Sequence, residues 1–76
     1  MTDSFDIAEL AAARFLAQSG EGRRLRIEAR ITLRELAEQV GVTKASVRLW
    51  ELGQMVPRGA NAVAYLRALR RIGARR

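Results

Sequence analysis

The chain of 76 residues contains no cysteine and no histidine. These two absences exclude disulfides, thiol nucleophiles, haem ligation by either residue, zinc fingers and every catalytic triad that depends on an imidazole. The longest stretch without a charged residue, residues 59–66, is far shorter than the ~20 residues needed to cross a bilayer. No basic segment of a signal peptide stands at the N-terminus, so we expect a cytoplasmic location and no membrane partner.

Charge is the most informative feature of the composition. Of the 14 basic side chains only Lys44 is a lysine, and 8 acidic side chains oppose them. Residues 1–22 carry four acidic side chains against one basic, whereas residues 23–76 carry thirteen basic against four acidic. Such a basic segment attracts phosphate and favours nucleic acid as the partner. On charge alone, a membrane surface or an acidic protein remains open.

Glycine and proline divide the chain into five stretches with helical spacing, and no stretch alternates for long enough to predict a strand. We therefore predict an all-α fold, with helices at about residues 6–18, 21–30, 33–40, 44–52 and 60–72. The second helix should place Ile27 and Ile31 on one face. Thr32 and Glu35 have the spacing of a capping box, and Thr43 is the expected N-cap of the fourth helix. Residues 74–76 are predicted to be a frayed tail.

Residues 33–52 meet the requirements of two helices joined by a tight turn. A small residue, Ala37, stands where the helices would cross, and Gly41 tolerates the left-handed backbone of the turn. The positions that close the angle between the helices are apolar: Leu36, Val40, Val42, Val47 and Trp50. An ordinary helical hairpin would not need Ala, Gly and a β-branched residue in that order, so the pattern predicts a helix-turn-helix.

Residues 23–69 resemble the Cro/C1-type (xenobiotic-response-element, XRE-like) helix-turn-helix domain of phage repressors and bacterial transcriptional regulators. The matching residues are TLRELAEQVGVT at 32–43, Ser46-Val47, WELG at 50–53, and Pro57. The resemblance implies a compact, lambda-repressor-like fold, and with the N-terminal helix the chain would form five helices. Residues 21–73 would be the DNA-binding domain. The helix within residues 1–20 departs from the family's pattern and is expected to be an accessory helix packing on that domain. The resemblance also implies a structural ion pair between Arg26 and Glu51. A MerR-type relative is set aside because its wing would need strands and a different spacing from the glutamate to the glycine.

The resemblance implies that helix 44–52 reads the major groove of double-stranded DNA. The residues expected to contact bases lie at or after the start of that helix: Thr43, Lys44, Ala45, Ser46, Arg48 and Leu49. Phosphate contacts are expected from the start of the preceding helix and from the following loop, at Leu33, Arg34, Gln54 and Arg58. The protein implied is a transcriptional regulator, repressor or Cro-like, in a bacterial cell or a phage-infected host and associated with the nucleoid.

The N-terminal helix leaves other partners open. It could cover the core, pair with a second copy in a homodimer, or bind another protein. The alternative function is accordingly an interaction module, such as an antitoxin or phage regulator, that docks a partner protein through residues 6–18. We expect no cofactor, no metal site and no enzymatic activity, because the serines have no imidazole to activate them and a chain this short has little room for a water-excluding pocket.

Overall fold

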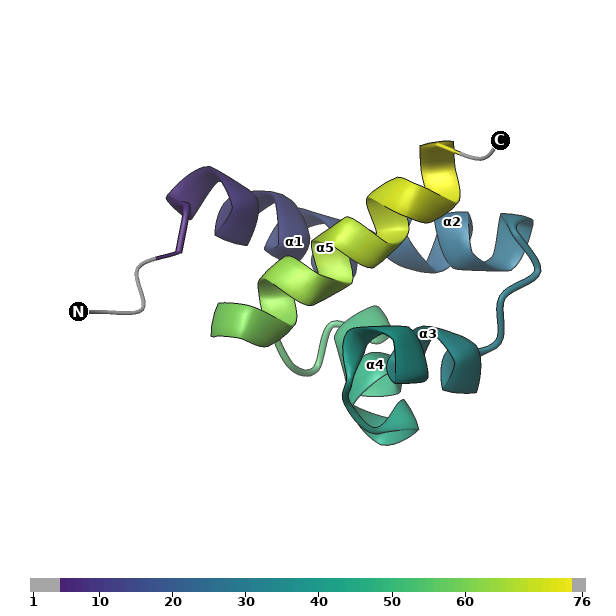
Figure 1. The fold of residues 1–76 in the computed structure, drawn as a ribbon. Coiled ribbons are helices and arrows are strands. Elements are labelled where there is room, and N and C mark those ends of the chain that lie inside the picture. The colour runs from purple at the N-terminus through teal and green to yellow at the C-terminus, as the bar shows by residue number, and fades with distance from the viewer. Residues whose placement is uncertain (1–4, 75–76) are drawn as a thin grey trace.

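The computed structural model describes residues 5–74, which form five helices and no strand (Figure 1). The helices are α1 (Ile7–Ser19), α2 (Glu21–Glu28), α3 (Leu33–Val40), α4 (Lys44–Glu51) and α5 (Gly59–Ala74). This arrangement confirms the prediction of an all-α fold with a helical pair at residues 33–52.

The last helix, α5, organises the packing. It crosses α1 and also packs against α2 and α3, while α3 and α4 pack on each other below it in the view of Figure 1. The rings of Trp50 and Tyr65 meet edge to face in the core, with their centroids 5.2 Å apart. The buried core residues come from α1, α3, α4 and α5: Ala13, Ala17, Leu36, Ala37, Val40, Val47, Trp50, Ala62, Tyr65, Leu66, Ala68 and Leu69.

Three helices begin at a side chain that accepts a backbone hydrogen bond. Asp6 accepts from the amide of Ala8 at the start of α1, and Thr43 accepts from the amide of Ser46 at the start of α4. At the start of α3, Thr32 and Glu35 form the full capping box. These caps satisfy amides that have no partner within their own helix.

The second helix ends earlier than predicted because the backbone turns left-handed at Arg30, with φ 62°. The amide of Arg30 donates to the carbonyl of Ile27 (2.9 Å) and the amide of Ile31 to that of Arg26 (3.0 Å), which is the Schellman pattern of a helix end. Ile31 therefore lies outside α2, and Ile27 is 45% exposed. The prediction that these two isoleucines share one helix face is wrong.

The first and last helices also differ slightly from their predicted bounds. Helix α1 begins and ends one residue later than predicted, because Asp6 is its cap and not its first residue. Helix α5 begins one residue earlier than predicted and continues to Ala74. The prediction of a frayed tail at residues 74–76 is therefore wrong for Ala74. Arg75 and Arg76 lie outside the described residues.

The first helix packs on the rest of the molecule through small side chains. Ala13 and Ala17 are fully buried, and Leu10 and Leu16 pack beside them. Glu9 adds two long ion-pair contacts to α5, at 3.7 Å from Arg67 and 3.9 Å from Arg70. The division of the chain into an accessory segment, 1–20, and a DNA-binding domain, 21–73, stays a prediction.

Candidate nucleic-acid interface

The turn between α3 and α4 is built around Ala37 and Gly41. The amides of Gly41 and Val42 both donate to the carbonyl of Ala37, at 2.8 and 3.0 Å. Gly41 has φ 89°, a conformation in which a side chain would be strained. Ala37 is buried where α3 meets α4, and Val47 and Trp50 bury the inner face of α4. The orientation of α4 is therefore fixed by the turn and by the core.

The outer face of α4 points to solvent. Lys44, Ala45 and Arg48 are exposed, and Ser46 and Leu49 are partly buried. Lys44 and Arg48 are four residues apart and so lie one helical turn from each other on the same face. The structure thus places five of the six predicted base-reading residues on the first two turns of one helix.

The sixth predicted base-reading residue, Thr43, precedes α4 and acts as its cap. Its hydroxyl oxygen accepts from the amide of Ser46 at 3.1 Å, and its hydroxyl donates to Oγ of Ser46 at 3.0 Å. Both side chains are therefore oriented by each other at the start of the helix. Base contact by either one stays a prediction.

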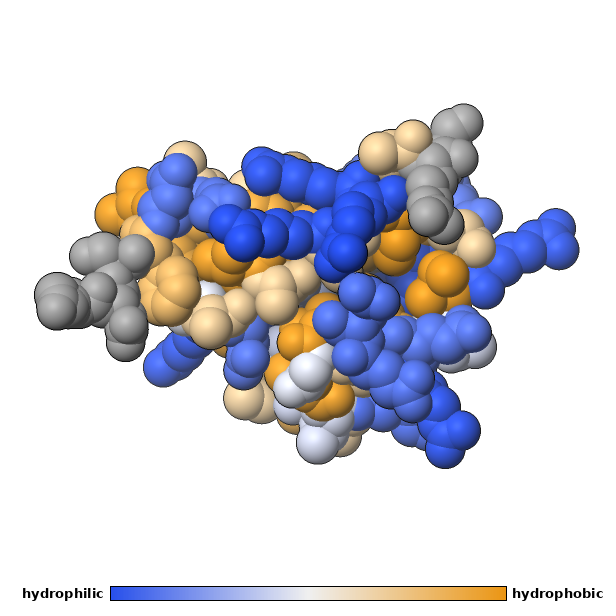
Figure 2. Space-filling view, viewed as in Figure 1, coloured by the Kyte–Doolittle hydropathy of each residue, from blue (hydrophilic) through white to orange (hydrophobic). Residues whose placement is uncertain are grey.

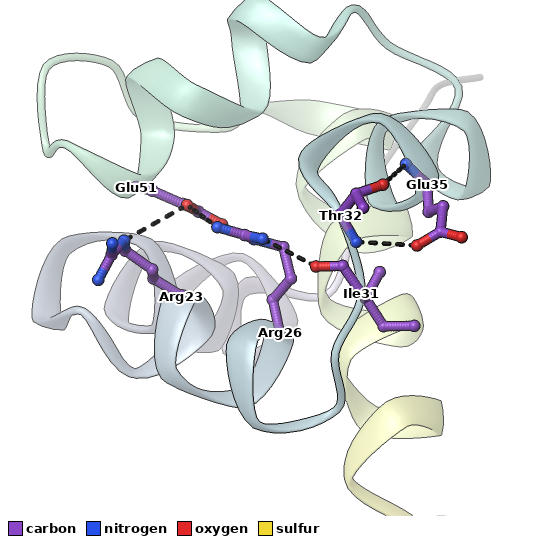
Figure 3. A network of polar contacts seen from close by, with 6 residues as sticks. All are labelled: Arg23, Arg26, Ile31, Thr32, Glu35 and Glu51. Atoms are coloured by element: carbon purple, nitrogen blue, oxygen red, sulfur yellow. Dashed lines mark hydrogen bonds and ion pairs between the residues drawn. The ribbon is translucent and has the colours of Figure 1, made fainter.

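The C-terminal end of α4 is anchored by a buried ion pair (Figure 3). Nε and Nη2 of Arg26, on α2, donate to the two carboxylate oxygens of Glu51 at 2.7 and 3.0 Å. Nη1 of Arg26 donates to the carbonyl of Ile31 at 2.8 Å, and Arg23 lies 4.0 Å from Glu51. The side chains of Arg26 and Glu51 are 11% and 5% exposed. This arrangement ties α2, the loop before α3 and the end of α4 together.

The start of α3 presents backbone amides beside an exposed arginine. The first hydrogen bond of the helix joins the amide of Leu36 to the carbonyl of Thr32 (3.0 Å), so the amides of Leu33 and Arg34 precede the helical ladder. The side chain of Leu33 packs against the core, whereas that of Arg34 is exposed. Leu33 can accordingly offer only its amide to a phosphate, while Arg34 can offer its guanidinium as well.

A shallow cavity of about 560 Å³ lies beside α4 and brings the predicted loop residues close to it. Gln54 and Arg58 line this cavity together with Ser46 of α4. Asn61, an exposed residue in the first turn of α5, lines it as well and was missed by the sequence reasoning. The signal for Asn61 was its place two residues after Gly59, the last residue of the Pro57-Arg58-Gly59 cluster and the first residue of α5.

The structure separates the basic side chains into two groups. Arg24 bonds Glu21 and Glu28, and these hydrogen bonds raise the pKa of the Arg24 guanidinium. Arg26, Arg67 and Arg70 also have carboxylate partners. Within residues 5–74, no carboxylate pairs with the four basic side chains of the predicted DNA-contacting set: Arg34, Lys44, Arg48 and Arg58. Their charge is therefore available to an external anion.

Residues 5–74 contain no group of three or more acidic, histidine or cysteine side chains that could hold a metal ion. None of the helices formed by those residues is long and apolar enough to cross a membrane.

Comparison with known proteins identifies the region that carries this geometry. A family model described as helix-turn-helix matches residues 23–72, which are well over half of the chain and include α3, α4 and most of α5. The search of curated proteins and the search of solved structures found no match. The chain therefore belongs to the Cro/C1-type helix-turn-helix family, whose domains bind DNA and are typically not enzymes.

Proposed function

We propose that the protein is a phage or bacterial transcriptional regulator, repressor or Cro-like, that binds a specific double-stranded DNA sequence with α4 in the major groove. Its place of action would be the cytoplasm, at the nucleoid. The observation that carries the proposal is the unpaired positive charge of Arg34, Lys44, Arg48 and Arg58 on and beside a helix whose inner face is fixed in the core.

The exposed face of α4 supplies the groups for base recognition. The guanidinium of Arg48 can donate two hydrogen bonds to O6 and N7 of a guanine, and Lys44, one turn earlier, can reach a guanine or a phosphate. Ala45 offers a methyl group that suits the methyl of thymine. Leu49 is partly buried, and its carbonyl accepts from the amides of Gln54 and Met55 at 3.0 and 3.3 Å. Its base contact would therefore be limited to the exposed part of its side chain.

Phosphate contacts would flank the groove on both sides of α4. The start of α3 provides the amides of Leu33 and Arg34 together with the Arg34 guanidinium. On the other side, Gln54, Arg58 and Asn61 border the cavity beside α4. Contacts of this kind position a protein on the duplex and carry no sequence information directly.

The proposal is tested by selection from a random pool of duplex DNA at ~0.15 M salt, where non-specific affinity is only about 10⁻⁴–10⁻⁶ M. Enrichment of a short common motif among the retained duplexes is expected. A pool that stays random while the protein remains folded would overturn sequence-specific binding.

Two arginine variants then separate base contacts from phosphate contacts on the selected duplex. Arg48→Ala should cost about 1–3 kcal/mol of binding free energy and relax the preference at one base pair. Arg34→Ala should weaken binding to all sequences alike and reduce the slope of log K against log salt by about one unit. Arg24→Ala is the matched control, because Arg24 is already bonded to Glu21 and Glu28. If Arg34→Ala changes the base preference and Arg48→Ala does not, the assigned roles are wrong.

A further inference from the structure

The exposed face of α4 carries two rows of side chains with different chemistry. Lys44 and Arg48 are four residues apart and form a cationic row, and both are exposed. Ala45 and Leu49 form an apolar row beside it, in which Ala45 is exposed and Leu49 partly buried. The lower part of Figure 2, where α3 and α4 lie, shows both hydrophilic and hydrophobic residues at this end of the molecule. The cationic row can only donate hydrogen bonds, and the apolar row can neither donate nor accept them.

The single carboxylate of α4 is buried away from this face. Glu51 lies at the C-terminal end of the helix, where its side chain is 5% exposed and accepts from Arg26 at 2.7 and 3.0 Å. The helix contains no asparagine, glutamine or aspartate. The amide side chains of Gln54 and Asn61 lie beyond its end and border the cavity where phosphate contacts are proposed. Among the side chains of α4 that reach solvent, only the hydroxyl of Ser46 could accept a hydrogen bond.

The hydroxyl of Ser46 is oriented by its neighbour Thr43. The Thr43 hydroxyl donates to Oγ of Ser46 at 3.0 Å, while the amide of Ser46 donates to Oγ1 of Thr43 at 3.1 Å. Each hydroxyl oxygen thus already accepts one hydrogen bond inside the protein. The proton of the Thr43 hydroxyl is used in this contact, whereas that of the Ser46 hydroxyl bonds no acceptor within residues 5–74. The pair therefore presents a further donor at the start of α4.

Donors without acceptors discriminate between the two purines in the major groove. Guanine presents two acceptors there, N7 and O6, whereas adenine presents the acceptor N7 beside the amino group at N6. Asparagine and glutamine usually read adenine, because an amide can donate to N7 and accept from the amino group. No such side chain stands on α4. An adenine amino group that faces the donors of α4 loses its hydrogen bond to water and gains none from the protein, which costs binding free energy.

We propose that α4 selects guanine, and not adenine, at the purines that it contacts in the major groove. Arg48 bonds both N7 and O6 of one guanine, while Lys44 and Ser46 donate to acceptors of neighbouring bases. Thr43 acts through Ser46 and is a positioning residue. The inference rests on the proposed function, because it specifies which bases the same helix reads.

Base analogues test the proposal on the duplex retained in the selection from random DNA. Replacing guanine by 7-deazaguanine removes the N7 acceptor, whereas hypoxanthine keeps N7 and O6 and lacks only the minor-groove amino group. At one guanine or more, 7-deazaguanine should raise Kd about tenfold and hypoxanthine no more than about twofold. Purine in place of adenine, which removes the amino group at N6, should leave Kd within about twofold at every position. The proposal is overturned if 7-deazaguanine is tolerated at every guanine, or if any adenine amino group proves necessary for binding.

Two variants test the assignment through a ratio, the Kd for a duplex with A·T at a guanine position divided by the Kd for the original duplex. The amide of Arg48→Gln can accept as well as donate, so this ratio should fall about tenfold at one position. Arg58→Gln is the matched control, because Arg58 is exposed and lies outside α4, and it should leave the ratio unchanged.

The outcomes separate this inference from the proposed function. Equal ratios in Arg48→Gln and in the native chain at every guanine would overturn the selection of guanine by α4. If the selection enriches no motif, the proposed function fails and this inference fails with it. An enriched motif with a contrary result from the analogues or from Arg48→Gln defeats this inference alone.

Discussion

Replacing Arg26 by alanine tests how strongly the ion pair with Glu51 holds the fold together. The change removes two hydrogen bonds to the Glu51 carboxylate and one to the Ile31 carbonyl. The Glu51 side chain, 5% exposed in the native protein, is then left with only the exposed guanidinium of Arg23 at 4.0 Å as a charged partner. An uncompensated buried charge costs about 3–5 kcal/mol, which is a large part of the roughly 4–11 kcal/mol expected for a domain of this length.

Urea unfolding measures this loss directly. Trp50 is the single tryptophan of the chain, and it is buried against Tyr65, so its emission reports unfolding. Arg24→Ala is the matched control because it removes two exposed ion pairs of α2, and solvent screening leaves such pairs little effect on stability. The reasoning is refuted if Arg26→Ala lowers the free energy of unfolding no more than Arg24→Ala does.

The double variant Arg26→Met, Glu51→Met separates the cost of an orphaned charge from the value of the pair. Replacing both partners removes the buried charges together and keeps much of the side-chain volume. Its free energy of unfolding should therefore exceed that of Arg26→Ala by more than about 1 kcal/mol. A double variant as unstable as Arg26→Ala would show that the loss of stability comes from removing the hydrogen bonds of Arg26, and not from leaving the Glu51 carboxylate unpaired.

Three further predictions concern the backbone and the buried tyrosine. Gly22→Ala should lower the free energy of unfolding by about 1–3 kcal/mol, because the new Cβ would overlap the Tyr65 hydroxyl. In a Tyr65→Phe background this loss of stability should be smaller. An equal loss in both backgrounds would contradict the overlap as its cause. Burial and, to a lesser extent, the charge of Glu51 raise the pKa of Tyr65 in the folded state, whereas the charge of Arg26 lowers it. The neutral tyrosine therefore contributes its full stability below about pH 10, and this contribution falls as the pH rises further. Urea midpoints measured from about pH 9 to 11 should fall in the native chain and fall less in Tyr65→Phe. Arg30→Gly should raise the thermal midpoint by relieving about 1 kcal/mol of left-handed strain, whereas the control Ala29→Gly, at φ −82°, should lower it.

The helices that carry the DNA-binding geometry could be predicted from the sequence because their signals are local. The residues of the capping box at Thr32 and Glu35 stand three apart, and Gly41 follows α3 directly. Together with the apolar spacing of residues 33–52, these signals set the bounds of α3 and the start of α4. Local hydrogen bonds and glycine conformation thus determine this part of the fold.

The features that the sequence did not predict depend on tertiary contacts. Arg30 takes a conformation that usually favours glycine, so the end of α2 had no sequence signal. Gly22 lies within a helix, where its role is to leave room for the Tyr65 hydroxyl from a helix more than forty positions away. The exposure of Ile7 and Phe15 likewise depends on alanines forming the packed face of α1, although hydrophobic content alone would have placed the larger residues inside.

The Arg26–Glu51 pair links the stability of the fold to the position of α4, the helix proposed to read DNA. Glu51 is the last residue of α4, so its anchor sets the C-terminal end of the helix while the Thr43 cap and the turn at Gly41 set the N-terminal end. With both ends held and Val47 and Trp50 buried between them, α4 keeps its orientation before any DNA is present. A helix held in this way loses little conformational freedom on binding, and a preorganised surface binds more tightly for the same contacts. If α4 reads DNA as proposed, the ion pair contributes to recognition without contacting DNA.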